Sequence, residues 1–189
     1  MKTKLLSIIF FLSACTIAYS QGEDNSLKGV PWKERIVTGG GLGLSFSRNQ
    51  DFFAVNPLLG YSFTKRLVAG TGATYQYIKF KNVTPNNQSI SINNYGLNPF
   101  VRYTVYEGFF AQAEYEWLSF EQPIEGGRKN FSSFLAGGGL LQPIGDKASF
   151  FVMVLYNFSY RTPQAGELAP YNSPIILRAG FNIGGVNLF

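Results

Sequence analysis

The sequence predicts an all-β fold, an eight-stranded antiparallel up-and-down transmembrane β-barrel. Three observations lead to this prediction. Charged residues are only 14% of the 189 residues, whereas aromatic residues are 16% and glycines number 21, which leaves few charges to coat a soluble domain. From residue 35 onward, segments of about ten residues or more alternate two kinds of side chain. Short turns and longer polar loops alternate between these segments, as in barrels that span a membrane.

The first 20 residues have the pattern of a secretory signal peptide. An apolar stretch over residues 5–17 follows two lysines, and Ala18 and Ser20 provide a small-x-small cleavage site. Residues 12–15 end in Cys15 and also resemble the site at which bacterial lipoproteins are cut and acylated, so two modes of processing stay open. Both imply export. We expect residues 21–33 to be a flexible segment and residues 34–189 to form the barrel.

The first four predicted strands run over residues 35–47, 52–63, 67–79 and 94–106. The first three alternate small or polar residues with aliphatic and aromatic ones. The fourth shows the two faces most clearly, with Tyr95 and Tyr103 on one face and Asn98 and Arg102 on the other. Residues 64–66 form a short turn, and residues 82–93 form a polar loop.

The last four predicted strands run over residues 109–120, 131–142, 149–160 and 174–189. The fifth alternates Tyr115 and Trp117 with Glu114 and Glu116, whereas the sixth is too rich in glycine for its faces to be assigned. The seventh and eighth each keep an apolar face of aliphatic and aromatic residues. Tight turns at residues 107–108 and 145–146, where glycine is present, precede the fifth and the seventh strand.

The aromatic face of the predicted strands is too continuous, and the opposite face too small and polar, for a soluble barrel with an apolar interior. We therefore expect the aromatic face to meet lipid and the charges to lie inside. Arg102 should lie beside Gln112 and diagonally near Glu114 if the hairpin turns about residue 107. The sequence thus predicts an ion network in the lumen, formed by Arg102, Glu114, Glu116 and Arg178.

Three stretches, residues 56–63, 67–70 and 98–103, resemble the small outer-membrane β-barrel family widespread in Bacteroidetes, relatives of the OmpA and OmpW barrels. The resemblance covers most of the chain from Gly39 onward and implies the architecture rather than an activity. The last residue, Phe189, with Phe181 and Ile183 at two-residue steps, is similar to the signal read by the barrel-assembly machinery. Gly185 and Asn187 depart from the usual apolar pattern.

Three functions follow from this architecture. The first is a structural or surface-interaction barrel whose lumen is filled by side chains and which has no catalytic role. The second, which the resemblance to OmpW-type barrels allows, is binding or passage of a small apolar ligand at Phe100, Phe110 and Leu118; these residues could equally plug the barrel. The third is an enzyme acting on envelope lipids. The chain has no histidine to activate a serine, and Glu114 with Glu116 fits a structural network better than a catalytic pair.

The expected partners are outer-membrane lipids and the barrel-assembly machinery. Without the leader, the chain has 14 Lys and Arg and 11 Asp and Glu. This excess of positive charge is too small to indicate that the protein binds nucleic acid. No metal or other cofactor is expected, because histidine is absent and the single cysteine lies in the leader. A set of cations near the predicted outer rim could meet lipopolysaccharide phosphates: Arg48, Lys79, Lys81, Arg128, Lys129 and Arg161.

Overall fold

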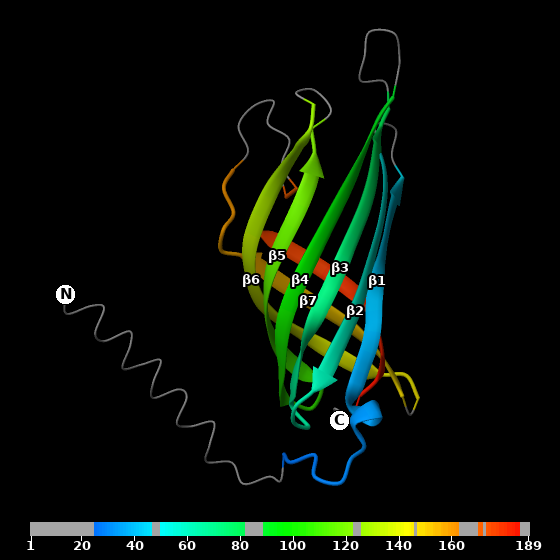
Figure 1. Cartoon of the computed structure of the whole chain (residues 1–189), viewed down its shortest axis with the longest axis vertical. Helices are drawn as coiled ribbons and strands as arrows, with labels where there is room; N and C mark the ends of the chain where they lie inside the picture. Colours follow the sequence, from blue (N-terminus) through cyan, green and yellow to red (C-terminus); the bar gives the residue numbers. More distant parts are fainter. Residues whose placement is uncertain are drawn as a thin grey trace, which may run out of the picture.

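The computed structural model describes residues 25–46, 50–81, 89–122, 126–145, 147–162, 170–171 and 173–185. They form a closed barrel in which each strand pairs antiparallel with the next, and β8 pairs back with β1 (Figure 1). A short 3-10 helix, η1 (Trp32–Arg35), precedes the barrel. The strands are β1 (Ile36–Phe46), β2 (Gln50–Ser62), β3 (Leu67–Phe80), β4 (Ile90–Tyr106), β5 (Phe109–Glu121), β6 (Arg128–Pro143), β7 (Ala148–Asn157) and β8 (Ile175–Gly184).

The predicted all-β, eight-stranded antiparallel barrel is confirmed, and the main differences lie at strand ends. Residues 90–93, predicted to be loop, belong to β4, because Ile92 pairs with Ile78 and both are buried in the lumen. Their burial outweighs the low strand propensity of the neighbouring polar residues. β6 likewise begins three residues earlier than predicted, at Arg128. β7 and β8 are shorter than predicted, and β8 ends at Gly184, which has a φ of 77°.

Side chains alternate between the lumen and the outside of the barrel. In β4, Asn98, Phe100 and Arg102 are buried, whereas Tyr95 and Tyr103 are exposed. Because one face of every strand in a closed barrel points inward, the buried residues line the lumen. The predicted assignment of faces in the fourth and fifth segments is therefore confirmed.

The structure shows which face of β6 points into the lumen, which the glycine-rich sequence of this strand did not predict. Its buried positions are Ser133, Leu135 and Leu141, so this face lines the lumen. A Cβ atom on Gly137 would overlap the carbonyl oxygen of Val154 in β7. Glycine is therefore required at this position because the two backbones approach closely.

Residues 25–33 make defined contacts at the end of the barrel that carries the tight turns, in contrast to the expected flexibility. Leu27 is only 3% exposed, and the backbone N–H of Lys65 in the β2–β3 turn donates to the carbonyl of Asn25. The Arg35 guanidinium donates to the carbonyl oxygens of Leu27 and Val30. These bonds hold the segment under the barrel, where Figure 1 shows it in blue.

The barrel wall is uneven in height. β7 and β8 have 10 residues each, whereas β4 has 17 and β6 has 16. Among the described residues, the β1–β8 ladder contains four residue pairs, from Val37–Gly184 to Gly40–Phe181. The wall is therefore lowest at β7 and β8, and its weakest seam joins β8 to β1.

Candidate functional site in the lumen

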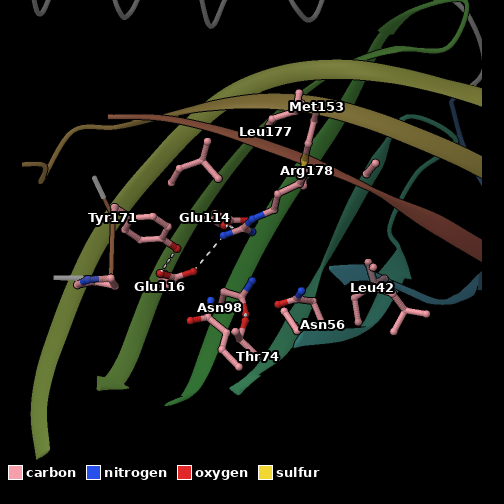
Figure 2. Close-up of a pocket in the computed structure, with 18 of the residues that line it drawn as sticks. Leu42, Asn56, Thr74, Asn98, Glu114, Glu116, Met153, Tyr171, Leu177 and Arg178 are labelled. Carbon is pink, nitrogen blue, oxygen red and sulfur yellow. Dashed lines mark hydrogen bonds and ion pairs between the residues drawn. The ribbon is translucent and has the colours of Figure 1, made fainter. Parts of the chain in front are cut away.

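A buried ion cluster lies in the middle of the lumen. The Arg178 guanidinium on β8 contacts two carboxylates on β5, with Nη1 2.5 Å from Glu114 Oε1 and Nη2 3.0 Å from Glu116 Oε2 (Figure 2). Both glutamates are 2% exposed. Alternation places Glu114 and Glu116 on the same face of β5, so one forked guanidinium can bind both.

Arg102 extends this cluster toward the tight-turn end. Its Nε donates to Gln112 Oε1 over 2.8 Å, and Gln112 Nε2 donates to Glu114 Oε2 over 2.8 Å. Arg102 pairs directly with Gln112 in the β4–β5 ladder, as the hairpin predicted. The structure thus brings together all four residues of the predicted ion network, with Gln112 as the link between Arg102 and Glu114.

Three phenylalanine rings surround the Arg102 guanidinium. Its Cζ lies 4.4 Å from the centroid of Phe110, 5.1 Å from Phe151 and 5.7 Å from Phe100. Cation–π contacts of this kind stabilise a guanidinium that has left water. The rings and the guanidinium together form a layer of side chains across the lumen, which we call the Arg102 layer.

Tyr171 completes the cluster from the connection between β7 and β8. Its hydroxyl donates to Glu116 Oε1 over 2.5 Å (Figure 2). Burial and the neighbouring Glu116 carboxylate raise the pKa of the Tyr171 hydroxyl, which keeps it protonated as a donor. Sequence reasoning missed this residue, because a tyrosine in a polar connection carries no periodic signal that would place it in the lumen.

A cavity of about 480 Å³ lies beside the cluster. Polar groups of Thr74, Asn98 and Glu116 line one part of it, and the apolar side chains of Phe52 and Phe120 line another. Its volume falls within the range of small-molecule sites in proteins. The lumen is therefore only partly filled by side chains.

The three residues predicted as a ligand pocket do not form one. Phe100 lines the cavity, but Phe110 and Leu118 do not. Each belongs to a different apolar cluster: Phe100 packs with Val37 and Val68, Phe110 with Leu135 and its neighbours, and Leu118 with Ile92. In the β4–β5 ladder Phe100 pairs with Glu114, four residues from Phe110 on one side and four from Leu118 on the other. Phe100 and Phe110 both contact the Arg102 guanidinium, whereas Leu118 lies eight residues from Phe110 along β5. A common inward direction therefore does not bring the three residues into one pocket.

The other predicted residues lie at the surface or outside the described residues. Phe181 and Ile183 point outward and are 54% and 58% exposed, while Phe189 lies outside the described residues. At the rim, Lys81 pairs with Asp51, and Arg128 donates to Ser119 and to the carbonyl of Asn93. Arg48 also lies outside the described residues.

The described residues contain no group of three or more metal-ligating side chains. Among these same residues, none of the helical segments has the length and hydropathy needed to cross a bilayer. No protein-family model, curated protein or solved structure matches the chain. The geometry of the barrel is therefore the basis for assigning a function.

Chemically, the cluster is suited to holding charges rather than to transferring protons. Glu116 accepts from both Arg178 and Tyr171, and Glu114 accepts from Arg178 and Gln112. A general base needs an accessible, unengaged oxygen near a substrate proton. The arrangement thus favours a structural role for these carboxylates.

Proposed function

We propose that the chain is an integral outer-membrane β-barrel protein with a structural or surface-interaction role and no catalytic activity. The observation that carries the proposal is the placement of side chains. Arg102, Glu114 and Glu116 are buried in the lumen, while large apolar residues cover the outside of the barrel, among them Leu42, Leu59, Leu97, Val101, Val154 and Leu177. A water-soluble barrel has the opposite arrangement.

Aromatic residues at the two ends of the apolar surface support this proposal. The ring centroids of Tyr75 and Tyr95 lie 5.5 Å apart, toward the long-loop end of β3 and β4. The ring centroids of Phe150 and Phe181 lie 5.3 Å apart, toward the tight-turn end of β7 and β8. Aromatic girdles at the two headgroup regions are typical of barrels in membranes.

The Arg102 layer supports a barrel that does not conduct solutes. The guanidinium is 3% exposed and is surrounded by phenylalanine rings. Below it, Val37 and Val68 are also buried. An eight-stranded barrel is narrow enough for such side chains to close it.

The proposed location is the outer membrane of a Gram-negative bacterium, reached after removal of residues 1–20 and with the help of the barrel-assembly machinery. It is supported by the leader pattern and by the resemblance to small Bacteroidetes barrels. Lipopolysaccharide is a proposed partner of the rim cations, and its depletion should lower thermal stability more than charge reversal at Lys129 does.

Tryptophan fluorescence tests membrane insertion directly. The chain has two tryptophans, Trp32 on η1 and Trp117 on the outer face of β5. In a Trp32→Phe variant refolded into phosphatidylcholine vesicles, brominated acyl chains should quench Trp117. The matched Trp117→Phe variant retains Trp32, which lies outside the apolar surface and should be quenched much less.

Two further measurements accompany this test. The folded protein should migrate faster than the boiled protein on a gel, and planar bilayers containing it should show no steady conductance. A mature chain that folds and stays in solution without detergent would contradict the proposal.

A further inference from the structure

The cavity in the lumen reaches the outer surface of the barrel. Its lining includes Leu42 on β1 and Leu177 on β8, which are 74% and 70% exposed. Figure 2 shows Leu177 and Leu42 together with the buried polar residues of the same cavity. A cavity lined by both kinds of residue opens through the wall, between β1 and β8.

The strand pairing explains this opening. The β1–β8 ladder ends at Gly40 and Phe181, yet β1 continues to Phe46 and β8 extends back to Ile175. At Gly41 the strands are still in contact, because a Cβ atom there would lie 2.7 Å from the carbonyl oxygen of Ala179. Beyond that point the described ladder contains no further pairs, so the strands separate beside the cavity.

The charges that line the cavity balance one another. Two arginines, Arg102 and Arg178, face two glutamates, Glu114 and Glu116, and the remaining described lining residues are uncharged. Each of these four side chains already has a hydrogen-bond or ion-pair partner in the cluster. A ligand with a net charge would have no counter-charge, so the cavity favours an uncharged ligand.

The cavity also offers amide groups with unused hydrogen-bonding capacity. Asn98 accepts from the Thr74 hydroxyl at 3.4 Å through Oδ1, and its Nδ2 has no hydrogen bond within the described part of the chain. Asn56, which lines the cavity on β2, makes no side-chain hydrogen bond to the described residues. Primary amides donate and accept, as needed for a hydroxyl or an amide group.

Much of the remaining lining is apolar, although Thr74, Gln76, Gln112 and Tyr171 also contribute to it. Phe52, Ile78 and Phe80 belong to the cluster at the long-loop end of the lumen, and they line the cavity on the side away from the Arg102 layer. A molecule bound here meets polar groups at one end and apolar side chains at the other.

We propose that this cavity binds an uncharged amphipathic molecule with a hydroxyl or amide head group, taken up from the lipid through the β1–β8 opening. The head group hydrogen-bonds to Asn56 and Asn98, and the apolar part packs against Phe52 and its neighbours. Uptake from lipid rests on the proposed membrane location. The ligand differs in polarity from the small apolar ligand considered from the sequence.

Met153 provides a single reporter for this site. It lines the cavity, is 4% exposed, and is the one methionine besides Met1 of the proposed leader. With ¹³C-methyl methionine in the barrel and 1-dodecanol supplied in the lipid of phosphatidylcholine nanodiscs, the Met153 methyl resonance should shift and saturate. Dodecyl sulfate and dodecyltrimethylammonium have the same chain with a charged head, and each should bind at least about tenfold more weakly.

A matched pair of variants locates the effect. Ala54 is buried on β2 and lines the cavity, so Ala54→Phe fills it; Ala111 is exposed on β5, so Ala111→Phe adds the same bulk outside. Dodecanol should no longer shift the Met153 resonance in the first variant and should still do so in the second. Asn98→Leu should weaken binding by about tenfold, the size of one good hydrogen bond.

Separate measurements test the proposed membrane insertion and the proposed binding site. Quenching of Trp117 by brominated lipid is measured on the same nanodisc samples, and its absence would refute membrane insertion. If Trp117 is quenched but dodecanol causes no saturable shift, the binding site is refuted while insertion stands. Equal shifts from the charged amphiphiles, or a shift that persists in Ala54→Phe, would also overturn the site.

Discussion

Replacing Arg178 with methionine should be among the most destabilising single changes in the barrel. Methionine keeps much of the apolar stem but removes the guanidinium that lies 2.5 Å from Glu114 and 3.0 Å from Glu116. Both carboxylates are 2% exposed and would lose their shared counter-charge. Breaking a buried pair costs about 3–5 kcal/mol. Because the Arg178 side chain is 21% exposed, we expect the lower end, about 3 kcal/mol.

The assay is urea-induced unfolding in phosphatidylcholine vesicles, followed by tryptophan fluorescence. A matched control is Lys81→Met, which breaks the ion pair with Asp51 at the rim, where the two side chains are 33% and 25% exposed. Exposed pairs contribute about 0–1 kcal/mol. A triple variant, Arg178→Met with Glu114→Gln and Glu116→Gln, removes the stranded charges and should recover much of the loss.

The reasoning is refuted if Arg178→Met loses no more stability than Lys81→Met. It is also refuted if the triple variant is as unstable as Arg178→Met alone, because the cost would then come from packing rather than from unpaired carboxylates.

Three further predictions concern the lumen wall. Asn182 is buried, and both of its amide atoms lack a hydrogen-bond partner among the described residues. Asn182→Leu should therefore raise the free energy of unfolding by about 1 kcal/mol. The control Asn157→Leu removes hydrogen bonds to Ser133 and Ser159, so it should lower the free energy of unfolding by a similar amount in the same urea titration. Gly137→Ala should reduce the yield of heat-modifiable barrel severalfold, because its Cβ overlaps β7; an unchanged yield would show that the strands can move apart. Phe110→Ala with Phe151→Ala should open the Arg102 layer and give bilayer conductance where the parent protein gives none.

Two-residue alternation predicts the eight strands and the inward faces of all but β6, because it depends on backbone geometry alone. In β6 the glycines carry no side chain that would distinguish one face from the other. The Arg102–Gln112 pairing is predictable for the same reason, since a tight turn at residues 107–108 sets the register of the hairpin. The start of β4 is not predictable this way, because the pairing of Ile92 with Ile78 depends on a partner strand. Tyr171 and the cavity depend on how a non-periodic connection folds into the lumen, and alternation says nothing about such segments.

Because the barrel has an even number of antiparallel strands, the start of β1 and the end of β8 lie at the same end of it. β1 begins and β8 ends at the end of the barrel that carries the tight turns and residues 25–35 (Figure 1). A protease site placed in the 107–108 turn and a tag joined ahead of residue 25 would therefore face the same side of a bilayer. A peptide inserted between β3 and β4 would face the other. Labelling of intact cells with an impermeant reagent thus distinguishes the two orientations of the barrel without any knowledge of its ligand.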